Sequence, residues 1–192
     1  LNSIKLYIIN NEKKNAVHYL NKFSKLVRKI LEASSQREIS LADELETVEL
    51  YMNIENIRFS NEINFNIHIK DDIDTHNIKI PSLILQPFLE NALWHGLSSK
   101  DGSKNIDLEI KKGKNGFIEI VITDNGVGRD AAEKIKDNKL LKRKSVGIDI
   151  TKERLANFSR DYENYFHVDI IDKFDDNTKP IGTQIVIYIP TI

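Results

Sequence analysis

The sequence contains no cysteine, only one tryptophan and one methionine, and four prolines among its 192 residues. Without cysteine the chain has neither disulfides nor thiolate metal sites, which fits a reducing compartment. No apolar run approaches the roughly 18 residues that a membrane-spanning helix requires. The formal net charge is −1, so no global charge favours a nucleic acid or a membrane surface as a direct partner. A charge-driven site must therefore be local.

The chain also lacks an initiator methionine and a targeting signal at its start. Residues 1–10 carry neither a charged n-region nor a cleavage site, and the helical pattern is already under way there. We therefore expect a fragment of a longer protein, with one or two domains.

Two long amphipathic helices are predicted in the first 58 residues. Over residues 14–33 an apolar stripe recurs at three- and four-residue spacing, with basic residues mostly opposite. Residues 41–58 repeat the pattern, and Ser40 followed by Asp43 and Glu44 supplies an N-cap and first-turn carboxylates. Such helices pack on each other or on a partner chain, so this region is predicted to be a helical hairpin or part of a dimeric bundle.

The hydrophobic period changes after residue 61, from helical spacing to the alternation of strands. The predicted strands are 63–69, 106–110, 117–123, 166–171 and 183–189, and the predicted helices between them are 82–95 and 148–160. Strands joined by hairpins, with helices able to cover one face, predict an α+β fold, a two-layer sandwich.

Most of the predicted helix 82–95 belongs to the segment LQPFLENALWHGL (85–97). This segment places Glu90, Asn91 and His95 in an otherwise apolar run. Each of these groups, buried without a partner, would cost about 1–3 kcal/mol. Such groups need partners, either from the protein or from a ligand.

Three glycine-containing segments follow this helix. Asp124-Asn-Gly-Val-Gly128 comes directly after a strand, where glycine permits close approach to a ligand, although Asp-Asn-Gly is also an ordinary turn. Ser145–Asp149 opens a helix, and backbone N–H groups and the helix dipole favour phosphate there. Gly182 and Thr183 begin the last strand. The order of these three segments along the chain is a far more specific signal than any one segment alone.

Together these segments resemble the ATP-binding region of LytS-type sensor histidine kinases, within the GHKL superfamily that also contains gyrase-like ATPases. ILQPFLENALWHGL resembles the N box, DNGVG the first glycine box, SVGIDITKERL the second, and GTQIVIYIP the closing Gly-Thr box. The resemblance implies a Bergerat-type two-layer α/β sandwich whose mixed, largely antiparallel sheet is covered by helices, preceded by an α-helical hairpin. It implies a helical dimerisation and linker region at 1–58 and an ATP-binding catalytic domain at 59–192.

The resemblance also assigns the site. It implies that Asn91 ligates the Mg²⁺ that bridges the phosphates of ATP, that Asp124 accepts a hydrogen bond from the adenine amino group, and that Thr183 supports Asp124. The other implied nucleotide-binding positions are Gly126 and Gly128 beside the base, Gly182 before Thr183, Gly147 at the phosphates, and His95 near phosphate or ribose.

Departures from the family pattern carry information. Ser145 and Ile150 replace a glycine and an asparagine of the second box, which puts the geometry of the nucleotide lid in doubt. Trp94 replaces a lysine often found at this position, so other basic residues must balance the negative charge of the phosphates. The loop 129–145 offers Lys142 and Arg143 for this, together with Lys134, Lys136, Lys139 and Lys144, although any of them could equally be a solvated surface residue.

Pro87 stands where gyrase-like relatives carry a glutamate that activates water, four residues before the metal-binding asparagine. Its presence favours phosphoryl transfer over hydrolysis. Glu90, adjacent to Asn91, has three open interpretations: it orients the water shell of the metal, it is the base during transfer, or it is a capping or surface carboxylate.

The function implied by the resemblance is that of a protein-histidine kinase in a two-component system, using ATP and Mg²⁺. LytS-type proteins carry the acceptor in an Asn-Pro-His-Phe motif whose continuation resembles Leu1-Asn-Ser-Ile4, so we expect the acceptor just upstream of residue 1 and no autophosphorylation by this fragment. His18 is the local alternative, but Tyr19 follows it where an acid is typical.

The implied partners are a second copy of the chain, bound through the helical region, and a response regulator, of LytTR type for this family. The resemblance places the chain in the cytoplasmic part of an inner-membrane bacterial sensor kinase, held to the membrane only through its missing N-terminal part. Two other functions stay open: a GHKL-fold ATPase and a non-catalytic dimeric scaffold.

Overall fold

The computed structural model describes residues 9–70, 72–114, 116–129, 146–159 and 166–190. The helices are α2 (Lys13–Ser34), α3 (Leu41–Arg58), α4 (Gln86–Asn91), the π-helix η1 (Ala92–Leu97) and α6 (Val146–Ser159). The strands are β1 (Glu38–Ser40), β2 (Ile63–Ile69), β3 (Lys79–Pro81), β4 (Lys104–Lys112), β5 (Phe117–Asp124), β6 (His167–Phe174) and β7 (Pro180–Pro190).

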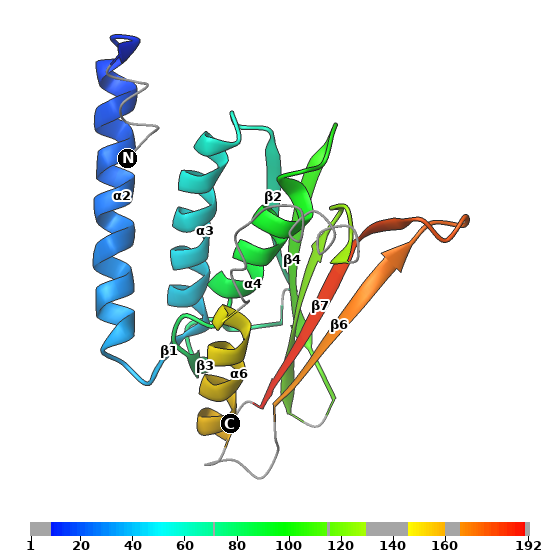
Figure 1. Ribbon diagram of the computed structural model, residues 1–192. Helices are drawn as coiled ribbons and strands as arrows, with labels where there is room; N and C mark the ends of the chain where they lie inside the picture. The colour runs from blue at the N-terminus through cyan, green and yellow to red at the C-terminus, as the bar shows by residue number, and fades with distance from the viewer. Residues whose placement is uncertain (1–8, 71, 115, 130–145, 160–165, 191–192) are drawn as a thin grey trace.

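The main sheet has the strand order β2-β4-β5-β7-β6. Its β2 and β4 strands pair in parallel and the other neighbours are antiparallel. Helices α3, α4 and α6 cover one face of this sheet, and α2 stands outside them next to α3 (Figure 1). The expected α+β sandwich with a mixed, largely antiparallel sheet is therefore confirmed.

Alternation along the strands explains which face of the sheet is buried. Ile106, Leu108 and Ile110 of β4 are completely buried, whereas the residues between them are partly exposed. The same alternation in β5 and β7 places isoleucines opposite each other, as in the pairs Ile120 with Ile187 and Ile122 with Ile185. Burial of this apolar face against the helices is the main source of stability.

Helix α3 belongs to the same core as the sheet. It begins and ends where its sequence predicts. At its start the Ser40 hydroxyl accepts a hydrogen bond from the Asp43 backbone N–H at 3.1 Å. Its Leu41, Val48 and Met52 side chains lie in one hydrophobic cluster with the strands. A domain boundary at 58/59 stays a prediction, since α3 completes the sandwich as well as packing on α2.

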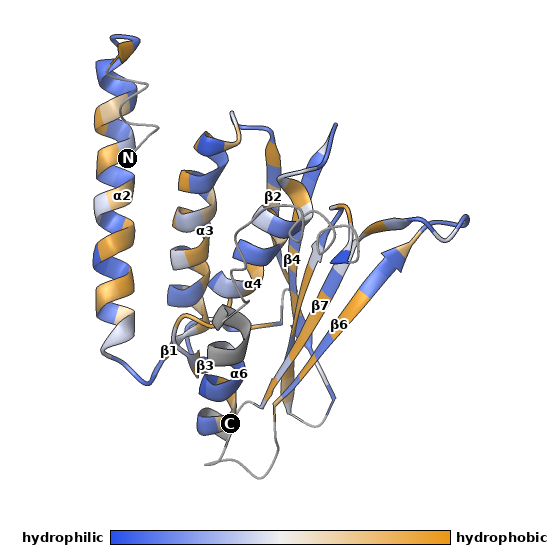
Figure 2. Ribbon diagram, in the orientation of Figure 1, coloured by the Kyte–Doolittle hydropathy of each residue, from blue (hydrophilic) through white to orange (hydrophobic). Residues whose placement is uncertain are grey.

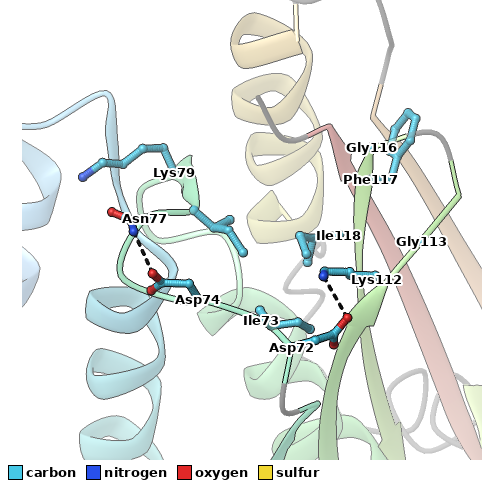
Figure 3. A pocket seen from close by; sticks show the side chains of 11 residues that line it. Asp72, Ile73, Asp74, Asn77, Lys79, Lys112, Gly113, Gly116, Phe117 and Ile118 are labelled. Carbon is cyan, nitrogen blue, oxygen red and sulfur yellow. Dashed lines mark hydrogen bonds and ion pairs between the residues drawn. The ribbon is translucent and has the colours of Figure 1, made fainter.

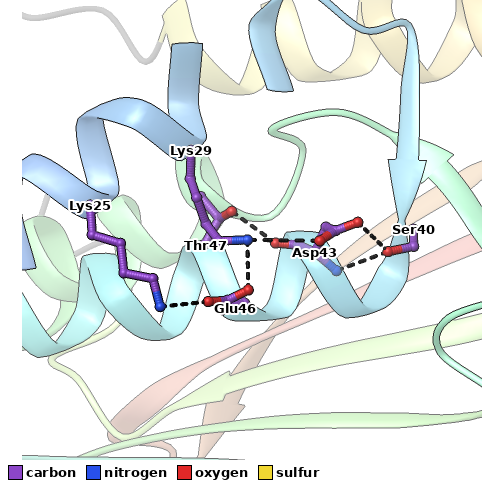
Figure 4. A network of polar contacts seen from close by, with 6 residues as sticks. All are labelled: Lys25, Lys29, Ser40, Asp43, Glu46 and Thr47. Atoms are coloured by element: carbon purple, nitrogen blue, oxygen red, sulfur yellow. Dashed lines mark hydrogen bonds and ion pairs between the residues drawn. The ribbon is translucent and has the colours of Figure 1, made fainter. Parts of the chain in front are cut away.

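Helix α2 packs on α3 through an apolar contact flanked by ion pairs. Tyr19 and Leu26 are buried in the shared cluster. Beside them the Lys29 ammonium lies 2.6 Å from the Glu46 carboxylate, which also pairs with Lys25 at 2.8 Å (Figure 4). The predicted packing of the two helices is thus present within one chain.

Much of the apolar stripe predicted on α2 faces away from α3. Hydrophobic residues recur along the helix (Figure 2). The exposed members are Val17, Leu20, Phe23, Val27 and Leu31, each at least 39% accessible. One face of α2 therefore contacts α3 and another presents apolar side chains to the surroundings.

Two local features differ from the predictions. The helix expected from residue 82 begins at Gln86, because Leu83 adopts a left-handed φ of 56° that no helix continues through. The short antiparallel pair of β1 and β3 was not predicted. Within the described part of the chain, no helix is long and apolar enough to cross a bilayer.

Candidate functional site

Asp124 is a nearly buried carboxylate at the end of a central strand. It is 5% exposed and lies opposite Thr183 in the register of β5 and β7. The Gly126 backbone N–H donates to its Oδ1 at 2.8 Å, and the Thr183 N–H also bonds the carboxyl. Burial nevertheless raises the pKa of Asp124, with these N–H bonds and then Lys100 opposing the increase. The structure thus brings the predicted Asp124 and Thr183 together.

Glycines let three backbone segments meet around Asp124. A Cβ on Gly182, whose φ is +143°, would lie 2.0 Å from the Asp124 carbonyl oxygen. A Cβ on Gly126 would lie 2.5 Å from the Cα of Gly96, and one on Gly128 would lie 2.6 Å from the Pro180 Cβ. The glycines of the first box and of the Gly-Thr box therefore serve close packing of the loop against η1 and β7.

Gly96 and Lys100 belong to this site, although the sequence did not single them out. A Cβ on Gly96 would lie 2.9 Å from Asp124 Oδ1, and the Gly96 carbonyl accepts a hydrogen bond from the Val127 N–H at 3.0 Å. The Lys100 ammonium donates to the Asn125 carbonyl. A glycine inside an apolar helical run was the available signal for Gly96, whereas nothing local marked Lys100.

Asn91 lies where the helix changes from α to π geometry. The change is seen in the hydrogen bond from the Ser98 N–H to the Leu93 carbonyl, five residues back, at 2.9 Å. The Asn91 Nδ2 donates to the Pro87 carbonyl at 2.8 Å. Its Oδ1, the atom that would bind a metal ion, is therefore directed away from that carbonyl. The apolar neighbours Leu89 and Leu93 are completely buried.

Glu90 lies toward α3. Its Oε1 accepts a hydrogen bond from Gln86 Nε2 at 2.9 Å. The pKa of Tyr51 on α3 is raised mainly by burial, and the charges of Glu55 and Glu90 add to this. Adjacent to Asn91 in sequence, Glu90 thus has a structural partner, and its proposed part in transfer stays a prediction.

The next residues of the N box are exposed. Trp94 packs against α3, with its ring 4.4 Å from the Arg58 guanidinium carbon and 5.3 Å from the Phe59 ring. His95 is exposed on η1 beside it. Trp94 therefore braces the N box against α3 at the position where relatives often have a phosphate-binding lysine.

The second glycine box is described only from its helix onward. Gly147 lies in the first turn of α6. Lys142 and Arg143 lie outside the described residues, as do all the other residues from 130 to 145. Their phosphate contacts stay a prediction.

A separate hollow of about 390 Å³ lies at the opposite end of β5 from Asp124. Phe117 and Ile118, which begin β5, line it together with the Asp72–Lys112 ion pair (Figure 3). This hollow contains none of the predicted site residues, so we do not assign the nucleotide to it.

Comparison with known proteins identifies relatives of one kind. A family model described as histidine kinase matches residues 1–63. The sensor histidine kinase/phosphatase LytS of Staphylococcus aureus is 32% identical over 120 residues, which cover 62% of this chain and 20% of that protein. The sensor protein LytS of Oceanobacillus iheyensis is 35% identical over 113 residues, which cover 59% of this chain and 19% of that protein. The chain thus spans about a fifth of the length of these curated relatives.

Solved structures share the fold. The histidine kinase domain of the blue-light activated histidine kinase from Erythrobacter litoralis matches with a TM-score of 0.54 at 14% identity, over 97% of this chain and 86% of that one. The mycobacterial sensor histidine kinase MprB matches with a TM-score of 0.52 at 15% identity, over 80% of this chain and 96% of that one. In sequence the chain is similar to sensor histidine kinases of the LytS type, as its motifs predict, and in fold it is similar to histidine kinase domains.

Proposed function

We propose that this chain is the ATP-binding part of a sensor histidine kinase of a two-component system, with α2 and α3 connecting it to the acceptor histidine. The buried Asp124, held by glycine-rich backbone beside the N box, is the observation that supports the proposal most. A carboxylate at this place accepts a hydrogen bond from the amino group of adenine, and Thr183 opposite it holds the carboxyl by its backbone N–H.

Asn91 is the residue proposed to hold Mg²⁺. Among the described residues no group of three or more His, Asp or Glu side chains could bind a metal ion. The donor set that fits is the single Asn91 Oδ1, completed by nucleotide phosphate and water, which is usual for Mg²⁺. When bound there, Mg²⁺ would neutralise charge that develops on the phosphates.

The proposed reaction is transfer to an imidazole. The bond from the γ-phosphorus to the β–γ bridging oxygen breaks, ADP leaves with the electron pair, a P–N bond forms, and the imidazole proton passes to a base. Glu90 is the candidate base, and Pro87 at the position of the hydrolytic glutamate in gyrase-like ATPases favours transfer over hydrolysis. Positioning and electrostatics carry most of the catalysis in such reactions.

The proposed partners follow from the same assignment. A second copy would bind through α2, and a response regulator, of LytTR type, would receive the phosphoryl group. One solved complex of this fold joins the histidine kinase ThkA to the response regulator protein TrrA, with a TM-score of 0.50 to this chain at 18% identity, over 98% of this chain and 51% of that one. We further propose that this part lies in the cytoplasm, joined to a membrane-embedded sensing part.

Calorimetric titration with Mg-ATP tests the nucleotide site. Asp124→Asn is expected to weaken binding by tenfold or more, roughly the value of a hydrogen bond to a charged group. Asn91→Ala is expected to remove the gain in affinity that Mg²⁺ provides. Asp169→Asn in β6 is the matched control and should bind as the wild type does. Unchanged affinity in Asp124→Asn would overturn the adenine assignment.

A second experiment tests the acceptor. A longer chain that includes the upstream histidine is expected to acquire acid-labile phosphate from ATP, and the present chain is not. His18→Gln in the longer chain should label normally. Loss of labelling in His18→Gln, with the upstream histidine dispensable, would assign the acceptor to α2 instead. Release of inorganic phosphate without labelling would favour an ATPase, and absence of nucleotide binding would favour a scaffold.

A further inference from the structure

Glu44 is a completely buried carboxylate on α3 that the proposed chemistry does not use. Its two oxygens accept hydrogen bonds from the backbone N–H groups of Leu83 and Leu85, each at 2.9 Å. The N–H of Ile84, between them, also bonds the carboxyl. Three consecutive backbone donors therefore converge on one side chain, forty residues away in the sequence.

The backbone that supplies these donors is strained. Leu83 has a φ of 56°, a region that a bulky side chain occupies at a cost of about 1–3 kcal/mol. Successive N–H groups in such a turn form a concave site for an anion. The chain fills this site with its own carboxylate, and the bonds to Glu44 offset the strain of the 82–85 turn.

The 82–85 turn begins the helix that carries Asn91. Leu85 is the N-cap residue of α4 but provides no side-chain cap of its own. The carboxylate of Glu44 replaces that cap and also lies favourably at the positive end of the helix. Asn91 follows six residues after Leu85 on the same rigid element. The direction of the turn therefore sets the position of Asn91.

Two other elements hold the same turn. The Arg154 guanidinium of α6 donates to the Ser82 carbonyl at 3.1 Å, and its charge also favours the ionised form of Glu44. The Ser82 hydroxyl donates to the Gln36 carbonyl, in the connection between α2 and α3, at 2.9 Å. Arg37 in that connection reaches the Asn157 carbonyl of α6 at 3.0 Å. The turn is therefore a junction of the connection, α3, α4 and α6.

We propose that Glu44 is a positioning residue for the metal-binding asparagine: it fixes the 82–85 turn, and through α4 it places Asn91 Oδ1 for Mg²⁺. The inference rests on the proposed function and adds a residue of α3 to its machinery. It also makes this turn the point at which a displacement of the α2–α3 connection reaches the site.

The test compares Glu44→Gln with Glu46→Gln, the same change at a partly exposed carboxylate on the side of the same helix that faces α2. ATP affinity is measured with Mg²⁺ and with EDTA. In Glu44→Gln the gain in affinity that Mg²⁺ provides is expected to fall about tenfold or more, as for groups that orient metal ligands. Affinity without Mg²⁺ should stay within about twofold, because the residues proposed to contact adenine, Asp124 and Thr183, lie on β5 and β7 and not on α4. Glu46→Gln should change neither value. An unaltered Mg²⁺ gain in Glu44→Gln would overturn the proposal.

A third variant distinguishes the positioning role of Glu44 from the effect of a general loss of stability. Ile187→Ala in β7 creates a core cavity far along the chain from the 82–85 turn. If it is destabilised as much as Glu44→Gln and loses the Mg²⁺ gain equally, the positioning role is refuted. Amide NMR gives a readout without nucleotide: the resonances of Leu83, Leu85 and the Asn91 side chain should move in Glu44→Gln and not in Ile187→Ala.

Different results would contradict the proposed function and the positioning role of Glu44. If the wild-type chain shows no Mg²⁺-dependent binding of ATP, the proposed function fails, and the NMR comparison still decides whether Glu44 positions Asn91. If the Asn91 side-chain resonances do not shift in Glu44→Gln, the positioning role of Glu44 is wrong, whether or not the chain binds ATP.

Discussion

Buried and exposed carboxylates of this protein include groups whose pKa values are shifted in opposite directions. Burial raises the pKa of Glu44 to about 7 and raises the pKa of Asp124, although backbone N–H groups bond both. At the surface, Arg129 holds the pKa of Asp172 below its ordinary value, through a bidentate ion pair with distances of 2.7 and 2.5 Å. Of these two buried carboxylates, Asp124 lies at the candidate site and Glu44 lies at the 82–85 turn.

The raised pKa of Glu44 predicts that the protein loses stability between about pH 5 and pH 8. The folded state holds the proton more tightly than the unfolded one, whose pKa is near 4.5, so the stabilisation is complete below that pH. It is lost as the pH rises through about 7, by roughly 3 kcal/mol at most. Urea unfolding of the wild type and Glu44→Gln at several pH values measures the difference.

Asp124 titrates in both proteins and cancels from that difference. Asp172, with its lowered pKa, affects stability only as the pH falls below about 3.8, outside the window. Stability curves that run parallel from pH 5 to pH 8 would contradict the prediction.

Gly182 provides a second prediction at the residue scale. Gly182→Ala combines a φ that L residues rarely adopt with a Cβ 2.0 Å from the Asp124 carbonyl oxygen. We expect a loss of several kcal/mol in unfolding free energy, of which strain alone is about 1–3 kcal/mol, and weaker nucleotide binding. Gly102→Ala is the control, because its φ is +80° and nothing lies within 4 Å of the added Cβ. Equal melting temperatures would show that the close approach at Gly182 relaxes without cost.

At the scale of elements, the contact between α2 and α3 combines two kinds of interaction. Tyr19 is 3% exposed, whereas the Lys25–Glu46 pair is 57% and 43% exposed. Exposed ion pairs contribute little, since water and salt screen them. The apolar contact is therefore expected to hold the helix in place, and the ion pairs to select its register.

Truncation of Tyr19 should consequently matter more than removal of the ion pairs. We expect Tyr19→Ala to cost about 3 kcal/mol and Glu46→Gln less than about 1 kcal/mol. Hydrogen exchange of the α2 amides is the measurement, because it reports local opening of a helix that stands outside the layer covering the sheet. The reverse ranking would mean that charge, and not burial, docks this helix.

At the scale of the whole molecule, the free apolar face of α2 predicts a dimer. Exposed stripes of this kind usually mark an interface, and the exposed side chains of Phe23 and Val27 lie one helical turn apart. Phe23→Glu is expected to shift the protein from dimer to monomer in sedimentation experiments, without loss of fold. Lys22→Glu, a charge change at the neighbouring residue, is the control. A wild-type chain that is monomeric at all accessible concentrations would remove the basis for this prediction.

Most of the secondary structure could be predicted, because the signals are local. Helix α3 matched its predicted bounds, with the cap at Ser40 marking its start, and β2 matched the alternation of 63–69. The glycine boxes and the N box were recognisable by order and spacing. Their glycines, however, proved to be needed for backbone packing around Asp124, which spacing alone did not indicate.

What only the tertiary structure decided depends on contacts between distant residues. The pairing of β1 with β3 joins three-residue strands that are too short for a periodic signal. At the turn around Leu83, the backbone N–H groups of Leu83 and Leu85 find their acceptors on Glu44, a distant residue of helix α3. Local periodicity thus determines which segments become helices and strands, whereas the unusual backbone of the turn at Leu83 is accompanied by a distant side chain that satisfies its N–H groups.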